Sequence, residues 1–366
     1  MVAVRGVSVA AQMVAIGATA IVLAQTPVVQ PPQAPTPAPS PESVKKAEQV
    51  LADARKALGG DKLADLKTLI ASGRTKRVRG NNLVPIEFEI LIELPNKYVR
   101  ADEFPAEDTD PTSSGFNGDT LIQIPPPTVP TGPGGPPGAA PVAPSQGRPT
   151  PPAAAAGAPP PGDMAAGGRM SGGRGPAMDP RRARLLSVKQ DYTRLALGLF
   201  GASTAYPLTF SYAAVAEAPQ GRADVLDAKG EGNFTLRLFI NSETRLPVMV
   251  SWTTPPTNVI VTVPGQPPPS SVAPGAVVVA GPPAPPKDAP KEEMDKYSKE
   301  VLAVRAKAQA TPIEQRLYFA DYRDVDGLKL PFRLRRAIGA ETTEETTFDR
   351  FRINAKLDQK KFEPVK

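Results

Sequence analysis

The chain has 366 residues, and its 46 prolines are more than twice the ~5% that is usual in globular proteins. Its formal net charge of +6, spread among mixed acids and bases, is too small to indicate a nucleic-acid partner. The absence of cysteine excludes disulfides and thiol chemistry, and the absence of histidine removes the commonest general base and zinc ligand. We therefore expect no cofactor and no nucleic acid.

The first 40 residues have the composition of an export signal and a tether. Arg5 precedes an apolar run over residues 7–24, which ends in the small-residue pattern of a cleavage site. We interpret residues 1–24 as a signal peptide and predict a periplasmic location. An uncleaved inner-membrane anchor is the alternative, because the run approaches the ~18 residues that span a bilayer. Residues 25–40 are spaced by prolines, which is typical of an extended tether.

An amphipathic helix is predicted over residues 41–58. Ser40 is suited to cap this helix, Pro41 to occupy its first position, and Gly59 to end it. Apolar residues recur at helical spacing, at Val44, Ala47, Leu51, Ala54 and Leu58. This stripe indicates a helix that packs on a sheet. A short second helical turn is expected through residues 63–69.

Strands follow, and the clearest covers residues 86–94, where apolar residues alternate with glutamates. Glu87, Glu89 and Glu93 lie on the face opposite the apolar one, which favours a solvated surface over paired catalytic carboxylates. Other strands in this part are predicted at residues 70–79, 97–104 and 120–124, with turns at 81–82, 95–96 and 116–119.

Two proline-rich stretches, residues 125–180 and 264–287, contain too few large apolar residues to bury surface, and we predict that both are disordered insertions. Between them a helix is expected over residues 181–200, where a basic entrance indicates a solvated helix end or, alternatively, a lipid-headgroup contact. Strands are predicted at residues 208–216, 222–228, 234–240 and 246–252, and residues 258–263 are expected to extend their pairing. A charged helix at 288–308 either covers the sheet or projects from it.

The C-terminal part is a ladder of three strands with one apolar face. Residues 313–320 and 328–335 alternate on either side of a turn at Asp326-Gly327, and a third strand covers residues 341–353. The apolar positions change parity between Phe348 and Phe351, which predicts a bulge. Asp321 and Asp324 lie beside the turn, and an aspartate-rich turn explains them better than a cation site.

These elements indicate one discontinuous domain over residues 41–366, because none of the segments between the insertions looks self-sufficient. The predicted fold class is mainly β with covering helices (α+β), built on a curved antiparallel sheet.

The element order and the motifs at the turns resemble the periplasmic lipoprotein-carrier superfamily, the LolA/LolB-like half-barrels. These motifs are LPN at residues 94–96, FNGDTL at 116–121, FINSETRLP at 239–247, YRDVDG at 322–327 and the closing stretch at 357–362. The resemblance implies a half-barrel whose concave apolar face is covered by helices and receives a lipid or a lipoprotein acyl chain. The carrier has an arginine before the Pro-Asn turn, where this chain has Leu94, which favours a divergent member with another apolar ligand.

We therefore predict a non-catalytic protein that binds lipid or a lipoprotein acyl chain, with transient contacts to a membrane surface or an envelope protein. The residues expected to line its cavity also fit a plain core; they are Ile86, Phe88, Ile90, Ile92, Leu236, Leu238, Phe319, Leu330 and Phe332. An envelope scaffold or protein-interaction module, with the half-barrel and the proline-rich insertions as its platform, is the alternative. An enzyme that works through carboxylates or a metal ranks last.

Overall fold

The computed structural model describes residues 39–126, except 81, 106 and 108, and residues 179–364, except 204, 219–220, 267–268, 270–271 and 287. The predicted signal peptide, most of the tether and nearly all of the first insertion lie outside these residues. No helix in the described part of the chain is long and apolar enough to cross a membrane.

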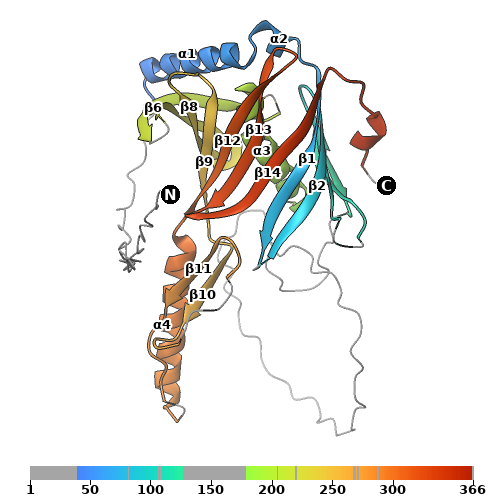
Figure 1. The fold of residues 1–366 in the computed structure, drawn as a ribbon. Coiled ribbons are helices and arrows are strands. Elements are labelled where there is room, and N and C mark those ends of the chain that lie inside the picture. The colour runs from blue at the N-terminus through green and yellow to red at the C-terminus, as the bar shows by residue number, and fades with distance from the viewer. Residues whose placement is uncertain are drawn as a thin grey trace, which may run out of the picture. The chain divides into compact units, whose positions relative to one another are not determined.

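The described residues form a 12-stranded antiparallel sheet in the order β5-β4-β3-β2-β1-β14-β13-β12-β9-β8-β7-β6 (Figure 1). Its first five strands are β1 (Thr68–Arg79), β2 (Asn82–Glu93), β3 (Lys97–Glu103), β4 (Thr112–Asn117) and β5 (Thr120–Ile124). The next four are β6 (Leu208–Ala218), β7 (Gly221–Gly230), β8 (Thr235–Asn241) and β9 (Pro247–Thr254). The last three are β12 (Ile313–Val325), β13 (Leu328–Ile338) and β14 (Glu341–Ile353).

The C-terminal ladder joins the two halves of this sheet. β14 pairs with β1 and β12 pairs with β9, so the last three strands lie between the first five strands and the four strands β6 to β9. β5 and β6 form the two edges, and the sheet is curved and open. The predicted fold class, a curved antiparallel sheet with helices, is therefore confirmed.

Two local predictions for the ladder are also confirmed. Asp326 and Gly327 both have positive φ, at 52° and 85°, as the tight turn between β12 and β13 requires. The register of β1 against β14 shifts between Ser72, opposite Arg350, and Gly73, opposite Phe348. This bulge leaves no residue of β1 directly opposite Asp349 in the register and lets the apolar side chains on both sides of it enter the same core.

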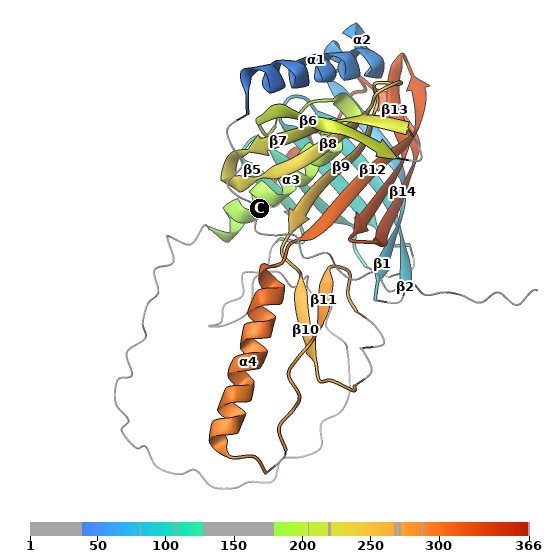
Figure 2. The ribbon, with the colours of Figure 1, turned by 90° about the vertical axis from the view of Figure 1, so that its left-hand side faces the viewer.

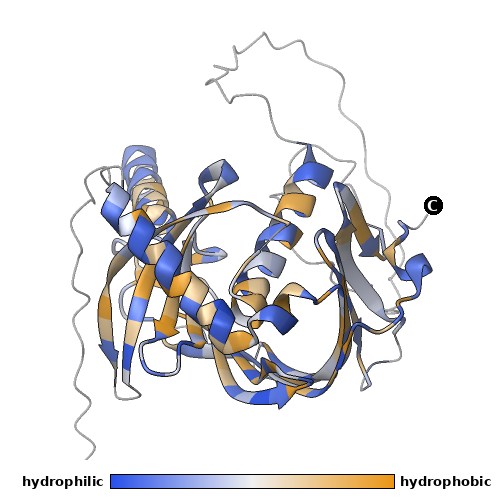
Figure 3. Cartoon of the chain, turned by 90° about the horizontal axis from the view of Figure 1, so that it is seen from above, coloured by the Kyte–Doolittle hydropathy of each residue, from blue (hydrophilic) through white to orange (hydrophobic). Residues whose placement is uncertain are grey.

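The helix α3 (Pro180–Phe200) lies in the hollow of the sheet (Figures 2 and 3). It contacts β4 and β5 near one edge and also β9 and β13, which are far away in the strand order. A single helix can touch both groups only if the sheet bends around it. Near the C-terminal end of α3, the backbone approaches β12 so closely that a Cβ on Gly198 would lie 2.0 Å from Phe319 Cε1.

The helix α1 (Pro41–Leu58) has the predicted bounds and contacts β6 and β13. Its N-terminus is capped by Ser40, whose Oγ accepts a hydrogen bond from the backbone N–H of Ser43 at 3.2 Å. The following helix α2 (Asp61–Ala64) is shorter than predicted, because β1 already begins at Thr68. The strand β4 was not predicted, because the sequence indicated only a turn at residues 116–119, which includes the last two residues of this strand.

Two predictions about residues 258–287 are corrected by the structure. Residues 258–263 do not extend the main sheet: β10 (Asn258–Thr262) pairs in parallel with β11 (Ala276–Ala280) in a separate two-stranded sheet. β11 falls inside the stretch expected to be a disordered insertion, where the run AVVVA is short but rich in β-branched residues. The helix α4 (Lys291–Ala310) packs on β10 and β11.

The core on the concave side is divided into two clusters, both of which include α3 side chains. A third and smaller cluster lies on the opposite face of the sheet, where Leu357 and Phe362 cover Ile70, Leu91 and Val99. Phe362 belongs to the 3₁₀ turn η2 (Gln359–Phe362). Because α3 covers the concave face, any cavity there is bounded by helix and sheet together.

Candidate functional site

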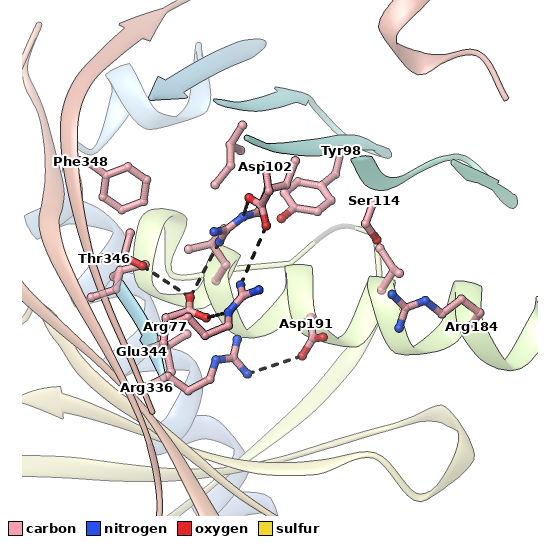
Figure 4. A pocket seen from close by; sticks show the side chains of 16 residues that line it. Arg77, Tyr98, Asp102, Ser114, Arg184, Asp191, Arg336, Glu344, Thr346 and Phe348 are labelled. Carbon is pink, nitrogen blue, oxygen red and sulfur yellow. Dashed lines mark hydrogen bonds and ion pairs between the residues drawn. The ribbon is translucent and has the colours of Figure 1, made fainter. Parts of the chain in front are cut away.

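A cavity of about 350 Å³ lies between α3 and the concave face of the sheet (Figure 4). Strands β1, β2, β3, β4, β12, β13 and β14 all contribute to its wall. Six of its lining side chains are apolar, namely Ile90, Val188, Leu195, Leu317, Leu334 and Phe348. The cavity also contains four arginines and three carboxylates, so it is more charged than the apolar hollow that the sequence analysis predicted.

Four of these charged side chains form one network. Arg77 Nε donates to Glu344 Oε2 at 2.9 Å, and Arg100 Nε donates to Asp102 Oδ1 at 2.6 Å. The two pairs are linked, because Arg77 also lies 3.9 Å from Asp102 and Arg100 lies 4.0 Å from Glu344. Arg100 Nη2 donates to Thr75 Oγ1 at 3.3 Å. This network sets two guanidinium groups against two carboxylates.

Burial by itself would raise the pKa of the Glu344 carboxyl, but the charges of Arg77, Arg100 and Arg336 outweigh it and hold this pKa below the ordinary value. For Arg100, burial works toward a lower pKa, and the charges of Asp102 and Glu344 outweigh it and raise the pKa. Both groups therefore stay ionised at neutral pH inside the cavity wall.

A second charged group lies on the α3 side of the cavity. Asp191 Oδ1 accepts a hydrogen bond from Arg194 Nη1 at 2.7 Å, and Arg336 Nη1 lies 4.0 Å from the same oxygen. The Arg194 guanidinium is stacked on Phe234 and Trp252, at 4.8 and 4.3 Å from the ring centroids. One carboxylate is thus shared by two arginines.

Aromatic side chains separate this cavity from a second one of about 230 Å³. Tyr98 lines the larger cavity, Tyr192 lines the smaller, and their ring centroids are 4.9 Å apart. Phe116 packs edge-on against Tyr192 at 5.4 Å. Burial raises the pKa of Tyr98 to about 12, and it also raises the pKa of Tyr192, so both phenols are neutral at physiological pH. The smaller cavity is mainly apolar and is lined in part by Leu94 and Phe200.

The nine residues predicted to line a cavity are all buried. Five of them pack with α3 in one cluster: Phe88, Ile90, Ile92, Leu330 and Phe332. Leu236, Leu238 and Phe319 pack in the other cluster. Only Ile90 of the nine lines the larger cavity, and the contact of these side chains with a ligand stays a prediction.

The charged side chains of the cavity were not predicted from the sequence, although strand parity places them on the same face as apolar core residues. Glu344 is four residues before Phe348 on the same strand, so the two side chains share a face. The same parity places Arg336 with Leu334, and Arg100 with Tyr98.

Three acidic side chains that the sequence singled out, Glu89, Asp321 and Asp324, have ordinary structural partners outside the cavity. Asp321 Oδ2 pairs with Arg323 Nη2 at 2.6 Å, and Asp324 Oδ1 accepts from the backbone N–H of Gly327 at 3.0 Å. Glu89, on the convex face, pairs with Lys361 at 2.6 Å. Within the described residues, no group of three or more acidic side chains is arranged to hold a metal ion.

Comparisons with known proteins give distant likenesses among solved structures. No family model and no curated protein matches the chain. A LolA superfamily protein from Nitrosomonas europaea is similar with a TM-score of 0.40 and 10% identity. An outer membrane lipoprotein-sorting protein domain from Vibrio parahaemolyticus has a TM-score of 0.40 and 8% identity, and a DUF1329 family protein from Desulfovibrio piger has 0.38 and 8%.

Each of these three matches covers 87% of this chain and 97% of the other. Two of the names agree with the superfamily that the strand-end motifs resemble.

Proposed function

We propose that this chain is an exported, non-catalytic protein of the cell envelope that binds a lipid or acyl chain between α3 and the concave face of its sheet. The observation that carries the proposal is the cavity of about 350 Å³ at this place, with apolar side chains from both the helix and the sheet. Ligand cavities in proteins range from about 300 to 1,000 Å³, so this one suits a single chain better than several.

Burial of an acyl chain supplies enough free energy without further machinery. Each buried methylene contributes about 0.8 kcal/mol, so about ten methylenes contribute about 8 kcal/mol before the cost of immobilising the chain. Val188 and Leu195 on α3 are positioned to contact such a chain from one side, with Leu334 on the other. The signal-like segment at the N-terminus supports export, and the absence of histidine and cysteine supports binding without catalysis.

Filling the cavity should weaken ligand binding and leave the fold intact. Ser114 on β4 lines the cavity, whereas alternation places its neighbour Ser113 on the other face of the strand. The tryptophan in Ser114→Trp occupies space that the ligand chain needs. If about two methylenes no longer fit, the binding free energy falls by about 1.6 kcal/mol, and binding is more than tenfold weaker. Fluorescence titration with a fatty acid that carries an environment-sensitive fluorophore measures this change in Kd.

Ser113→Trp is the matched control, and its Kd should stay within about twofold of the wild-type value. A folded Ser114→Trp protein that binds the probe as well as wild type would place the binding site elsewhere and contradict the proposal. Circular dichroism of both variants establishes that each is folded.

A protein-interaction module is the second candidate, and α4 favours it. Met294 and Leu302 are large apolar side chains on this helix and both are exposed. Crosslinking in cells would support this candidate if a constant protein partner is captured by wild type and by Ser114→Trp alike, and lost in Leu302→Asp.

A further inference from the structure

We propose that the ligand of the larger cavity is an anionic amphiphile, and that Arg336 binds its carboxylate or phosphate while the apolar wall holds its chain. This inference rests on the proposed function and names the chemical class of the ligand. The distribution of charge around the cavity carries it.

The arginines of the cavity divide into two kinds. Arg77 and Arg100 are engaged by Glu344 and Asp102 through hydrogen bonds of 2.9 and 2.6 Å. They form a closed network in which charges of opposite sign balance. These two guanidinium groups are therefore neutralised by the wall itself and leave little positive charge for a ligand.

Arg336 is different. Its nearest carboxylate among the described residues is Asp191, at 4.0 Å, which is beyond hydrogen-bond distance. Glu344 lies directly opposite Arg336 on β14 but accepts its hydrogen bond from Arg77. That carboxylate is already hydrogen-bonded to Arg194 at 2.7 Å. The Arg336 side chain is 30% exposed and lines the cavity, so its N–H groups are accessible from the cavity space.

Two further arginines add positive charge in or beside the cavity. Arg184, which is exposed and also lines the cavity, donates to the neutral side chain of Gln123 at 3.3 Å and has no carboxylate within 4 Å in the described part of the chain. Arg194 is buried, and its Nε has no hydrogen-bond partner. In and beside the cavity, therefore, five guanidinium groups stand against three carboxylates, those of Asp102, Asp191 and Glu344.

The position of Arg336 also suits an amphiphile. Leu317 lies directly opposite Arg336 on β12, and Leu334 precedes it by two residues on the same face of β13. Arg336 can then form a charge-assisted hydrogen bond with the polar head of a ligand while the adjacent leucines contact the methylenes of its chain.

Isothermal titration calorimetry with three ligands that each have a ten-carbon chain tests the inference on the full-length protein. Decanoate and decyl phosphate carry an anionic head, and methyl decanoate is the uncharged comparison. Wild type should bind both anions more tightly than the ester, and the better anion identifies the head group as carboxylate or phosphate. Arg336→Gln should weaken binding of that anion by about tenfold or more, because a hydrogen bond to a charged group is lost, and leave the ester within about twofold.

Arg333→Gln is the matched control, because Arg333 is exposed on the opposite face of β13. This substitution should change the affinity for neither the anion nor the ester. Arg336→Lys, which keeps the charge, should recover part of the affinity for the anion. If wild type binds anions and ester equally, or Arg336→Gln weakens both to the same extent, the anion site is overturned while chain binding stands. If wild type binds none of the three ligands, the proposed function fails as well. If Arg336→Gln does not fold, Arg184→Gln, at an exposed position, gives a second test. It should weaken binding of the anion and leave binding of the ester unchanged.

Discussion

Truncation of Tyr192 to alanine should lower the free energy of unfolding by about 3–5 kcal/mol, the range for a large buried aromatic side chain. Tyr192 is 2% exposed and packs against Tyr98 and Phe116 at centroid distances of 4.9 and 5.4 Å. Its removal therefore loses burial, two aromatic contacts and the volume of the ring. Urea unfolding followed by circular dichroism, extrapolated to zero denaturant, measures the change.

Leu302→Ala on α4 is the control for this truncation, because Leu302 is 63% exposed and its loss should cost less than about 0.5 kcal/mol. Tyr192→Ala should also join the two cavities, since the Tyr98–Tyr192 pair stands between them. A variant as stable as wild type would mean that α3 does not pack in the hollow of the sheet as described.

Replacement of Glu344 by glutamine should lower the free energy of unfolding by about 3 kcal/mol. This value is near the low end for breaking a buried ion pair, because 35% of the Arg77 side chain is exposed. The glutamine leaves Arg77 and Arg100 with only Asp102 as a charged partner in their network. Glu345→Gln is the matched control, since Glu345 is exposed on the opposite face of β14 and should change stability by less than about 0.5 kcal/mol.

The stability difference between wild type and Glu344→Gln should depend on pH. The pKa of Glu344 is lower in the folded protein than its ordinary value of 4.5. The ionised carboxylate therefore contributes fully to the free energy of unfolding above pH 4.5, and this contribution is lost as the pH falls through the lowered pKa. Wild type and Glu344→Gln should therefore differ most at neutral pH and converge in acid. A constant difference between pH 7 and pH 3 would contradict the ionised network.

The sequence predicted most of the fold because the strands are long and alternate cleanly. Residues 86–94, 313–320 and 328–335 each carry one apolar face, and the parity change between Phe348 and Phe351 located a bulge that the register confirms. The errors concern short elements. β4 has the sequence TSSGFN, with little apolar alternation, and β11 is five residues within a proline-rich stretch.

The site was harder to predict because burial depends on what lies opposite a strand. Alternation places Arg336 and Glu344 on the concave face, but it gives no sign that α3 leaves a cavity there. The same holds for Arg194, whose burial against Trp252 joins two segments far apart in the sequence. Strand parity can therefore list the residues of a face, and only the arrangement of α3 on the sheet separates core from cavity.

Photocrosslinking with a fatty acid that carries a diazirine on its chain, followed by mass-spectrometric mapping of the labelled residues, tests the central claim most directly. Binding between α3 and the concave face predicts labels on Val188 or Leu195 of the helix and on Leu334 of β13. Labels confined to the convex face or to α4, or no label at a ligand concentration that saturates a lipid-binding control protein, would contradict it.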